Sequence, residues 1–131
     1  MHSREYLQGD KRQQERSYSP AVKTTGGTTI YLAGFGGFQD AEGKTYPGDF
    51  DAQTRVAFDR MRETLQRAGG TLDDVVTMTV FVTDIKNGTR FTELRREFFQ
   101  PGCYPGSALI GIKELARPEM MLEIQAIAVI N

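Results

Sequence analysis

The sequence predicts an α+β domain in which two helices cover one face of a mixed β-sheet. Three observations support this: β-prone runs lie at both ends of the chain, two segments between them have helical spacing of apolar residues, and a further β-prone run separates those two segments. The predicted order is β-β-α-β-α-β-β. Each helix then crosses between strands of one sheet, and 131 residues suit one such domain.

The first half supplies two strands and a helix. Residues 18–23 and 28–33 are rich in strand-forming types, and the glycine-containing turn between them predicts a β-hairpin. Residues 50–68 predict a helix, capped by Asp49 or Asp51. Its apolar stripe consists of Ala52, Val56, Ala57, Met61, Leu65 and Ala68.

The second half supplies strands over residues 72–83, 105–112 and 120–130, and a helix over residues 89–100. The side chains of this helix expected to face the sheet are Phe91, Leu94, Phe98 and, as a further candidate, Arg95. The last strand has apolar or small residues on both faces. Because two helices cover only one face, we expect a second copy of the chain to cover the other, and therefore a homo-oligomer.

Composition limits the remaining classes. Residues 1–16 are almost entirely polar, which predicts a mobile or loosely docked extension before a single domain at 17–131. A net charge of −1 gives no reason to expect nucleic-acid or anionic-membrane binding, and no apolar run is long enough to span a bilayer. The polar N-terminus does not resemble a secretory signal, and Cys103 is the one cysteine, so we expect a reducing cytoplasmic location. Cys103 and His2 alone are too few for a zinc site.

Glu123 is the first candidate for a functional residue. It is the one acid in the apolar run of the last strand. A charge among apolar neighbours is costly unless it is paired, hydrogen-bonded or facing a cleft. A carboxylate in a cleft can position water and transfer protons, whereas the alternative is a structural glutamate at a subunit seam.

An ordered set of stretches over residues 17–130 resembles the Rid family of enamine/imine deaminases, also called the YjgF/YER057c/UK114 family. They are Tyr-Ser-Pro-Ala-Val at 18–22, Leu-Ala-Gly at 32–34, Gly-Asp-Phe-Asp-Ala-Gln-Thr at 48–54, Ala-Gly-Gly-Thr-Leu-Asp-Asp-Val-Val at 68–76, Thr-Val-Phe-Val-Thr-Asp at 79–84, Phe-Phe at 98–99 and Leu-Glu-Ile-Gln-Ala-Ile-Ala-Val at 122–129. The resemblance implies a chorismate-mutase-like fold, a homotrimer with a central barrel, and three clefts between subunits. It also implies hydrolysis of reactive enamines and imines without a metal or organic cofactor.

The resemblance assigns substrate-site roles to Tyr18, Gly34 and Glu123. It also reveals one departure, because Ser107 stands where members of the family carry an arginine, and Leu109 where many carry a cysteine. A guanidinium holds a substrate carboxylate with two charge-assisted hydrogen bonds, whereas serine offers one neutral donor. Small 2-imino acids such as 2-aminoacrylate are therefore expected to be poor substrates.

Two aromatic, one aliphatic and three basic residues are candidates for the same pocket. Phe35 and Phe91 are expected to form pocket wall or core, and with Leu109 they predict a more apolar site. Arg117 is the main candidate for a replacement cation, with Arg95 and Arg96 as further candidates.

Two functions follow as hypotheses. The first is hydrolytic deamination of a 2-aminomuconate-like enamine or imine. The alternative is a non-catalytic trimer that binds a small molecule or protects against stress. Nuclease activity, which the family has also been named for, is disfavoured by the net charge of −1.

Overall fold

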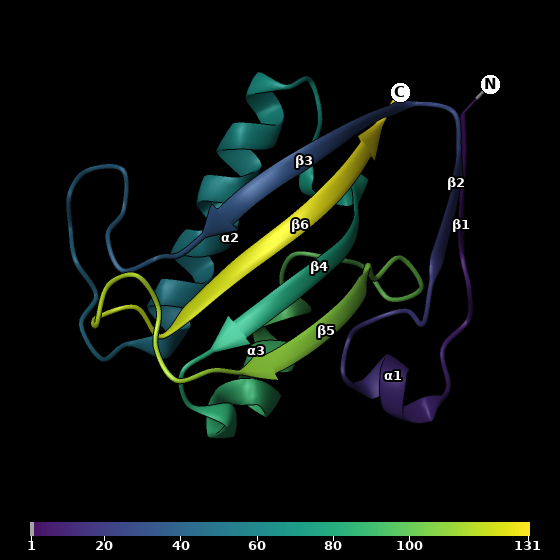
Figure 1. Ribbon diagram of the computed structural model, residues 1–131. Coiled ribbons are helices and arrows are strands. Elements are labelled where there is room, and N and C mark those ends of the chain that lie inside the picture. The colour runs from purple at the N-terminus through teal and green to yellow at the C-terminus, as the bar shows by residue number, and fades with distance from the viewer. Residues whose placement is uncertain (1) are drawn as a thin grey trace.

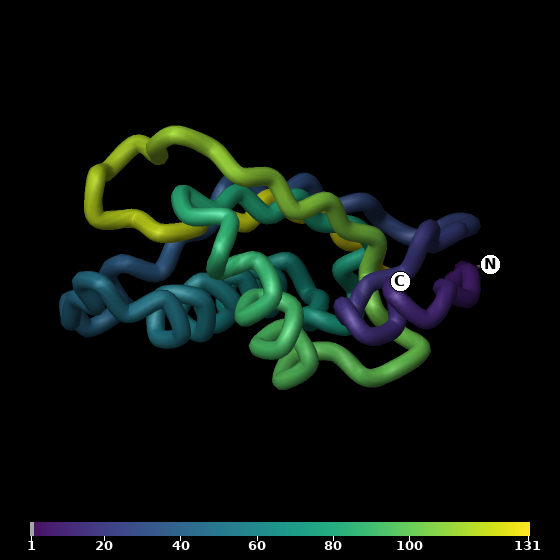
Figure 2. The backbone as a smooth tube through the Cα atoms, turned by 90° about the horizontal axis from the view of Figure 1, so that it is seen from below, coloured from purple at the N-terminus to yellow at the C-terminus, as the bar shows by residue number. Residues whose placement is uncertain are grey.

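The computed structural model describes residues 2–131 and has two layers, a sheet and a pair of helices that cover one of its faces (Figures 1 and 2). The sheet order is β3-β6-β4-β5, in which β4 and β5 are parallel and β6 is antiparallel to both β3 and β4. These strands are β3 (Thr28–Phe35), β4 (Val75–Val82), β5 (Gly106–Gly111) and β6 (Leu122–Ile130), and the helices are α2 (Phe50–Arg67) and α3 (Gly88–Arg95). The predicted α+β class is confirmed.

The predicted helices are both present, with one difference in length. Asp49 caps α2 by accepting a hydrogen bond from the Ala52 N–H at 3.0 Å. The helix α3 ends at Arg95, five residues before the predicted end. Beyond it the backbone tightens into turns with i→i+3 hydrogen bonds, such as Phe98 N–H to Arg95 C=O at 3.0 Å.

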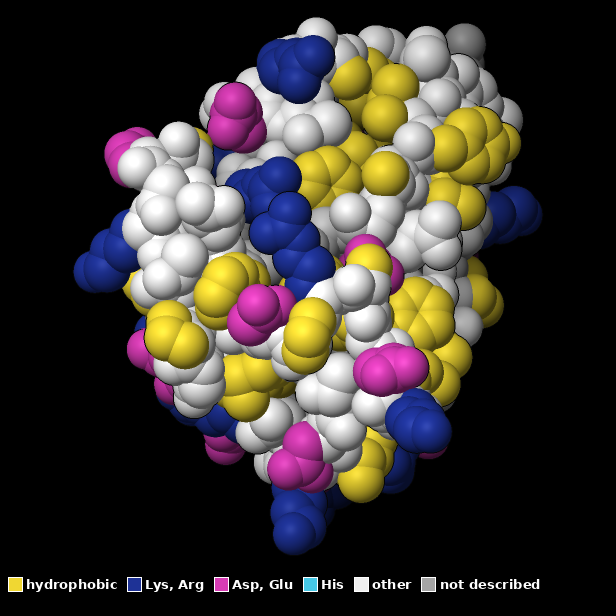
Figure 3. All heavy atoms as spheres, turned by 60° about the vertical axis from the view of Figure 1, so that its left-hand side comes forward, with side chains coloured by type: hydrophobic (Ala, Val, Ile, Leu, Met, Phe, Trp, Pro, Cys, Tyr) yellow, Lys and Arg dark blue, Asp and Glu magenta, His cyan; other side chains and the backbone are white. Residues whose placement is uncertain are grey.

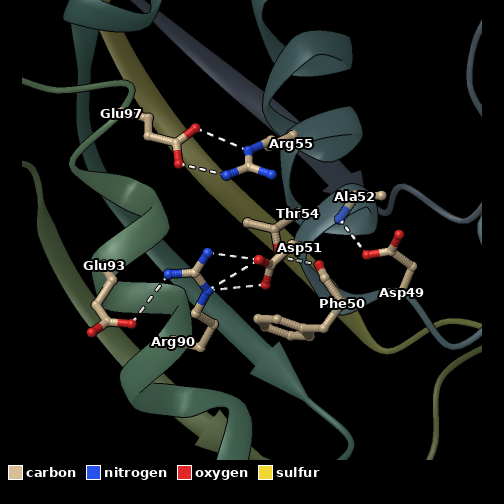
Figure 4. Close-up of polar contacts among 9 residues, drawn as sticks. All are labelled: Asp49, Phe50, Asp51, Ala52, Thr54, Arg55, Arg90, Glu93 and Glu97. Carbon is tan, nitrogen blue, oxygen red and sulfur yellow. Dashed lines mark hydrogen bonds and ion pairs between the residues drawn. The ribbon is translucent and has the colours of Figure 1, made fainter.

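Two ion pairs join α2 to α3 on the surface (Figure 4). Arg55 donates to both carboxylate oxygens of Glu97, at 2.9 and 2.8 Å. Arg90 similarly binds Asp51 with two nitrogens, and it also reaches Glu93. These hydrogen bonds hold the pKa values of Asp51 and Glu97 below their usual range.

The N-terminal segment differs from expectation in two ways. Residues expected to be mobile or loosely docked form β1 (Ser3–Tyr6) and α1 (Lys11–Glu15). The predicted hairpin is wrong, because β2 (Val22–Thr25) pairs with β1, while β3 diverges from it to join the main sheet (Figure 1). Arg4 fastens the extra strand by donating to the carbonyls of Asp73 at 2.7 Å and Val129 at 2.6 Å.

The second sheet face is not covered by a helix, as predicted. Tyr31 on β3 and Ile110 on β5 expose 78% and 42% of their surface. At the start of β4, Val75 is buried although it lies three residues from the buried Met78 and would face the opposite side in a regular strand. The pairing of β4 with β6 shifts register between Val75 and Thr77, so the alternation breaks there.

No helix in the described residues is both long and apolar enough to cross a membrane.

Candidate active site

Glu123 emerges from β6 on the side away from the helices. Its neighbours Leu122 and Ile124 are fully buried in the core, so the alternation of the strand turns Glu123 to the other face. There it lines a hollow of about 480 Å³, which we call the Glu123 hollow. Gly34 and Arg117 line it as well, so these three predicted site residues are brought together.

Gly34 is needed for the position of the Glu123 carboxylate. A shift in the β3–β6 register between Tyr31 and Gly34 places Gly34 opposite Gln125. A Cβ atom at residue 34 would lie 2.6 Å from Oε1 of Glu123. The carboxylate therefore packs directly over the backbone of β3, and any side chain at position 34 would displace it.

Gln53, whose role the sequence did not indicate, fixes the two loops around this hollow. Its buried side chain donates to the carbonyls of Tyr46 and Glu119, at 2.9 and 3.2 Å, and accepts from the Met121 N–H at 3.0 Å. These partners belong to the loops before α2 and before β6. A Cβ at Gly37 would lie 1.8 Å from the Gln53 carbonyl, so the first loop touches the helix backbone.

The Glu123 hollow has mixed charge. Asp40, Arg60, Glu63 and Arg117 line it, and no ion pair within the described part of the chain involves Glu123. The Tyr46 hydroxyl donates to Asp40 at 2.8 Å and lowers the pKa of that carboxyl. On this side of the molecule basic and acidic side chains are interspersed with apolar ones (Figure 3).

A second hollow, of about 510 Å³, lies at the β5 edge of the sheet and is called here the Ser107 hollow. Tyr18, Ser107 and Leu109, all predicted site residues, line it. Tyr18 and Leu109 are half-buried. The segment between α1 and β2 forms its outer wall, where Ser19 is bridged to Gly106 and donates to the Tyr104 carbonyl at 2.6 Å.

Arg95, one of the further candidates for a replacement cation, lies beside Ser107. The guanidinium of Arg95 donates from Nη1 to the Ser107 hydroxyl at 2.7 Å and lines the same hollow. Arg12 and Arg16 line it too, so the pocket is not the more apolar one expected. Arg96 lines a different hollow and donates to the Glu15 carbonyl.

Of the two places expected for Phe35 and Phe91, pocket wall or core, the structure puts both at the core. Phe91 is fully buried in the core. The Arg95 guanidinium carbon lies over its ring, 5.1 Å from the ring centre, so the two side chains make a cation–π contact. Phe35 is half-buried against the core. Neither residue lines the Glu123 hollow or the Ser107 hollow.

The two hollows share no lining residue within one chain. The Glu123 hollow lies beside β3 and the start of β6, and the Ser107 hollow lies beside β5. The strands β3 and β5 are the two opposite edges of the sheet. Of the predicted residues, Gly34, Arg117 and Glu123 therefore meet in one place, and Tyr18, Ser107 and Leu109 in another. In residues 2–131, no three His, Cys, Asp or Glu side chains are grouped as metal ligands.

Comparison with known proteins gives the family. The family model described as endoribonuclease L-PSP matches residues 10–130. The crystal structure of YyfB from Yersinia pestis, a Rid-family protein of unknown function, superposes with a TM-score of 0.86 at 26% identity, covering 97% of this chain and 98% of that one.

Two further structures agree. A member of the YjgF/YER057c/UK114 family from Mycobacterium tuberculosis is 31% identical, with a TM-score of 0.68 over 98% of this chain and 100% of that one. RidA from the Antarctic bacterium Psychrobacter sp. is also 31% identical, with a TM-score of 0.71 over 87% and 89% of the two chains. The chain therefore belongs to the endoribonuclease L-PSP family, also known as the Rid or YjgF/YER057c/UK114 family.

Proposed function

We propose that this protein is a hydrolytic deaminase that converts a reactive enamine or imine to an oxo product and ammonia. The observation that supports this best is the position of Glu123. Its carboxylate lines a hollow, packs over the Gly34 backbone, and has no cationic partner in residues 2–131. A carboxylate in this setting is free to accept a proton from water.

The chemistry that this group would perform is limited and balanced. Protonation of an enamine at carbon gives an iminium, or an imine is protonated at nitrogen. Water then adds to the carbon while Glu123 accepts one of its protons. The protonated Glu123 returns that proton to the nitrogen. The C–N bond then breaks and ammonia leaves, while the Glu123 carboxylate accepts the hydroxyl proton as the carbonyl forms and passes it to solvent.

We further propose that the substrate lies between subunits of a homotrimer. The sheet face that carries Tyr31 and Ile110 is uncovered, which favours contact with another copy. The predicted site residues lie in two separate hollows at opposite edges of the sheet. In a ring of subunits, the Glu123 hollow of one copy can face the Ser107 hollow of the next, which would complete the site.

The experiment is ammonia release from enzymatically generated imines and enamines, including 2-aminoacrylate and 2-aminomuconate. The proposal expects release by the native protein and its loss in Glu123→Gln. Glu114→Gln, an exposed acid-to-amide change in the loop before β6, is the matched control and should be fully active.

Two other outcomes would contradict the proposal. If no compound releases ammonia although a small molecule binds, the protein is a non-catalytic binder. If RNA is cleaved and Glu123→Gln abolishes the cleavage, the activity is the one that the family's description names.

A further inference from the structure

Arg95 is a buried cation whose hydrogen-bond partners among residues 2–131 are all neutral. It is the last residue of α3 and exposes 1% of its surface. Its three nitrogens donate to the Ser17 hydroxyl at 3.1 Å, the Ser107 hydroxyl at 2.7 Å and the Arg16 carbonyl at 3.0 Å. A guanidinium has five N–H groups, so two are left over for another acceptor.

No carboxylate neutralises this charge. Among residues 2–131, Arg95 takes part in no ion pair, whereas the exposed Arg55 and Arg90 and the half-buried Arg62 each have an acidic partner. Burial, together with the neighbouring Arg16, lowers the pKa of Arg95 to about 10. A buried charge without a counter-charge is unfavourable, and a bound anion would relieve that cost.

Within residues 2–131, every charged side chain that lines the hollow beside Arg95 is cationic. Arg12 and Arg16 line it with Arg95, and no acidic residue does. In the part of the chain that the structure describes, the side chains of Arg12 and Arg16 also have only neutral hydrogen-bond partners, the hydroxyls of Tyr18 and Thr89 respectively, each at 3.5 Å. Arg12 is exposed and Arg16 half-buried, so these two residues mark the open side, or mouth, of the Ser107 hollow. Positive charge therefore extends from the buried Arg95 to this mouth.

We propose that the Ser107 hollow binds an organic anion with two carboxylates, one held by Arg95 and the other by Arg12 and Arg16 at the mouth. Arg95 has N–H groups to spare for the inner carboxylate, and Ser107 and Ser17 position its guanidinium. Two arginines at the mouth would stay without a counter-charge if the ligand had one carboxylate only. If the proposed deaminase function holds, this anion is its substrate class.

Binding should be measured by isothermal titration calorimetry with cis,cis-muconate and with sorbate. Both are six-carbon dienes, but muconate has two carboxylates and sorbate one. The proposal expects muconate to bind more tightly by about tenfold or more. It also expects the double variant Arg12→Gln/Arg16→Gln to reduce muconate affinity to that of sorbate, with sorbate binding little changed. Arg67→Gln, an exposed arginine at the end of α2, is the control and should bind both as the native protein does.

Arg95 is tested by two variants whose fold is checked by circular dichroism. Arg95→Lys keeps a positive charge but loses the planar guanidinium that can bind a carboxylate with two hydrogen bonds. The affinity for muconate should therefore fall by about tenfold. The double variant Arg95→Ser/Ser107→Arg moves the guanidinium from α3 to β5. It should bind muconate more tightly than Arg95→Ser alone. Equal affinities for muconate and sorbate, or unchanged muconate binding in a folded Arg95→Lys variant, would overturn the proposal.

The two proposals can fail separately. Muconate binding without ammonia release from any compound would retain this anion site and reject the deaminase. Ammonia release without muconate binding would reject this anion site and retain the deaminase.

Discussion

The Glu123 hollow and the Ser107 hollow are built in different ways. The first has acids and bases together and is walled by two loops that Gln53 ties to α2. The second has three arginines, no acid, and a wall contributed by the N-terminal segment. This difference suggests a division of labour, in which one hollow supplies the proton-transferring group and the other supplies charge to hold an anion.

The largest effect is expected at Glu123. Glu123→Gln keeps the shape of the side chain but cannot accept a proton, so the rate of ammonia release should fall by at least about 100-fold. The thermal unfolding midpoint should stay near that of the native protein. Retained activity in this variant, with Glu114→Gln alongside, would remove the chemical role from the Glu123 hollow.

The next effect is expected at Gln53. Gln53→Leu leaves the Met121 N–H and the carbonyls of Tyr46 and Glu119 without their partner, at a cost of about 2–4 kcal/mol in the free energy of unfolding. Urea unfolding measures this, with Gln66→Leu on the exposed side of α2 as the control. Activity should fall as well, because both loops around Glu123 lose their anchor. If the free energy of unfolding falls no more than in Gln66→Leu, the two loops do not depend on Gln53 for their position.

Gly34→Ala should separate activity from stability. The new Cβ would meet the end of the flexible Glu123 side chain, which can move, so the free energy of unfolding should change by less than about 1 kcal/mol. The displaced carboxylate should lower the rate of ammonia release by about tenfold. Full activity would mean that the close packing of Glu123 on β3 is unimportant.

The smallest effect is expected in the Arg55–Glu97 pair, which lines neither hollow. Both side chains are 44% exposed, so Glu97→Gln should cost less than about 1 kcal/mol at pH 7. The pairing lowers the pKa of Glu97 in the folded state. The stabilisation that the Arg55–Glu97 pair gives the folded protein is therefore fully present above the pKa of about 4.3 that Glu97 has in the unfolded chain. It is lost as the pH falls through the lower pKa of Glu97 in the folded protein.

Urea midpoints of native protein and Glu97→Gln should accordingly differ slightly at pH 7 and coincide at about pH 2 to 3. A difference that persists at low pH would show that the amide acts through something other than charge.

Much of the fold could be predicted because it depends on local patterns. The apolar stripe of α2 and the alternation along β6 identify which side chains are buried without knowledge of their partners. The position of β2 could not be predicted in this way. Two β-prone runs around a glycine turn predict a hairpin, but β2 pairs with β1 instead. Arg4 on β1 binds the carbonyls of Asp73 and Val129, which lie 69 and 125 positions further along the sequence.

The site shows the same limit. Glu123 and Gly34 could be identified from a charge in an apolar strand and from a resemblance, and the structure brings them together. The cation could not be placed, because Arg95 reaches Ser107 from a helix twelve residues earlier, and the length of α3 determines where its last side chain points. Gln53 gave no signal at all, since its three partners lie in loops.

The central claim is that the two hollows form one site between subunits, and mixing two inactive variants tests it most directly. Glu123→Gln and Arg95→Met subunits, each inactive alone, are co-expressed in equal amounts and assayed for ammonia release. If each site takes Glu123 from one subunit and Arg95 from the next, random assembly should restore about a quarter of native activity. Tyr18→Ala can replace Arg95→Met if that variant does not fold. No recovery in a mixed oligomer of two folded variants would contradict the account.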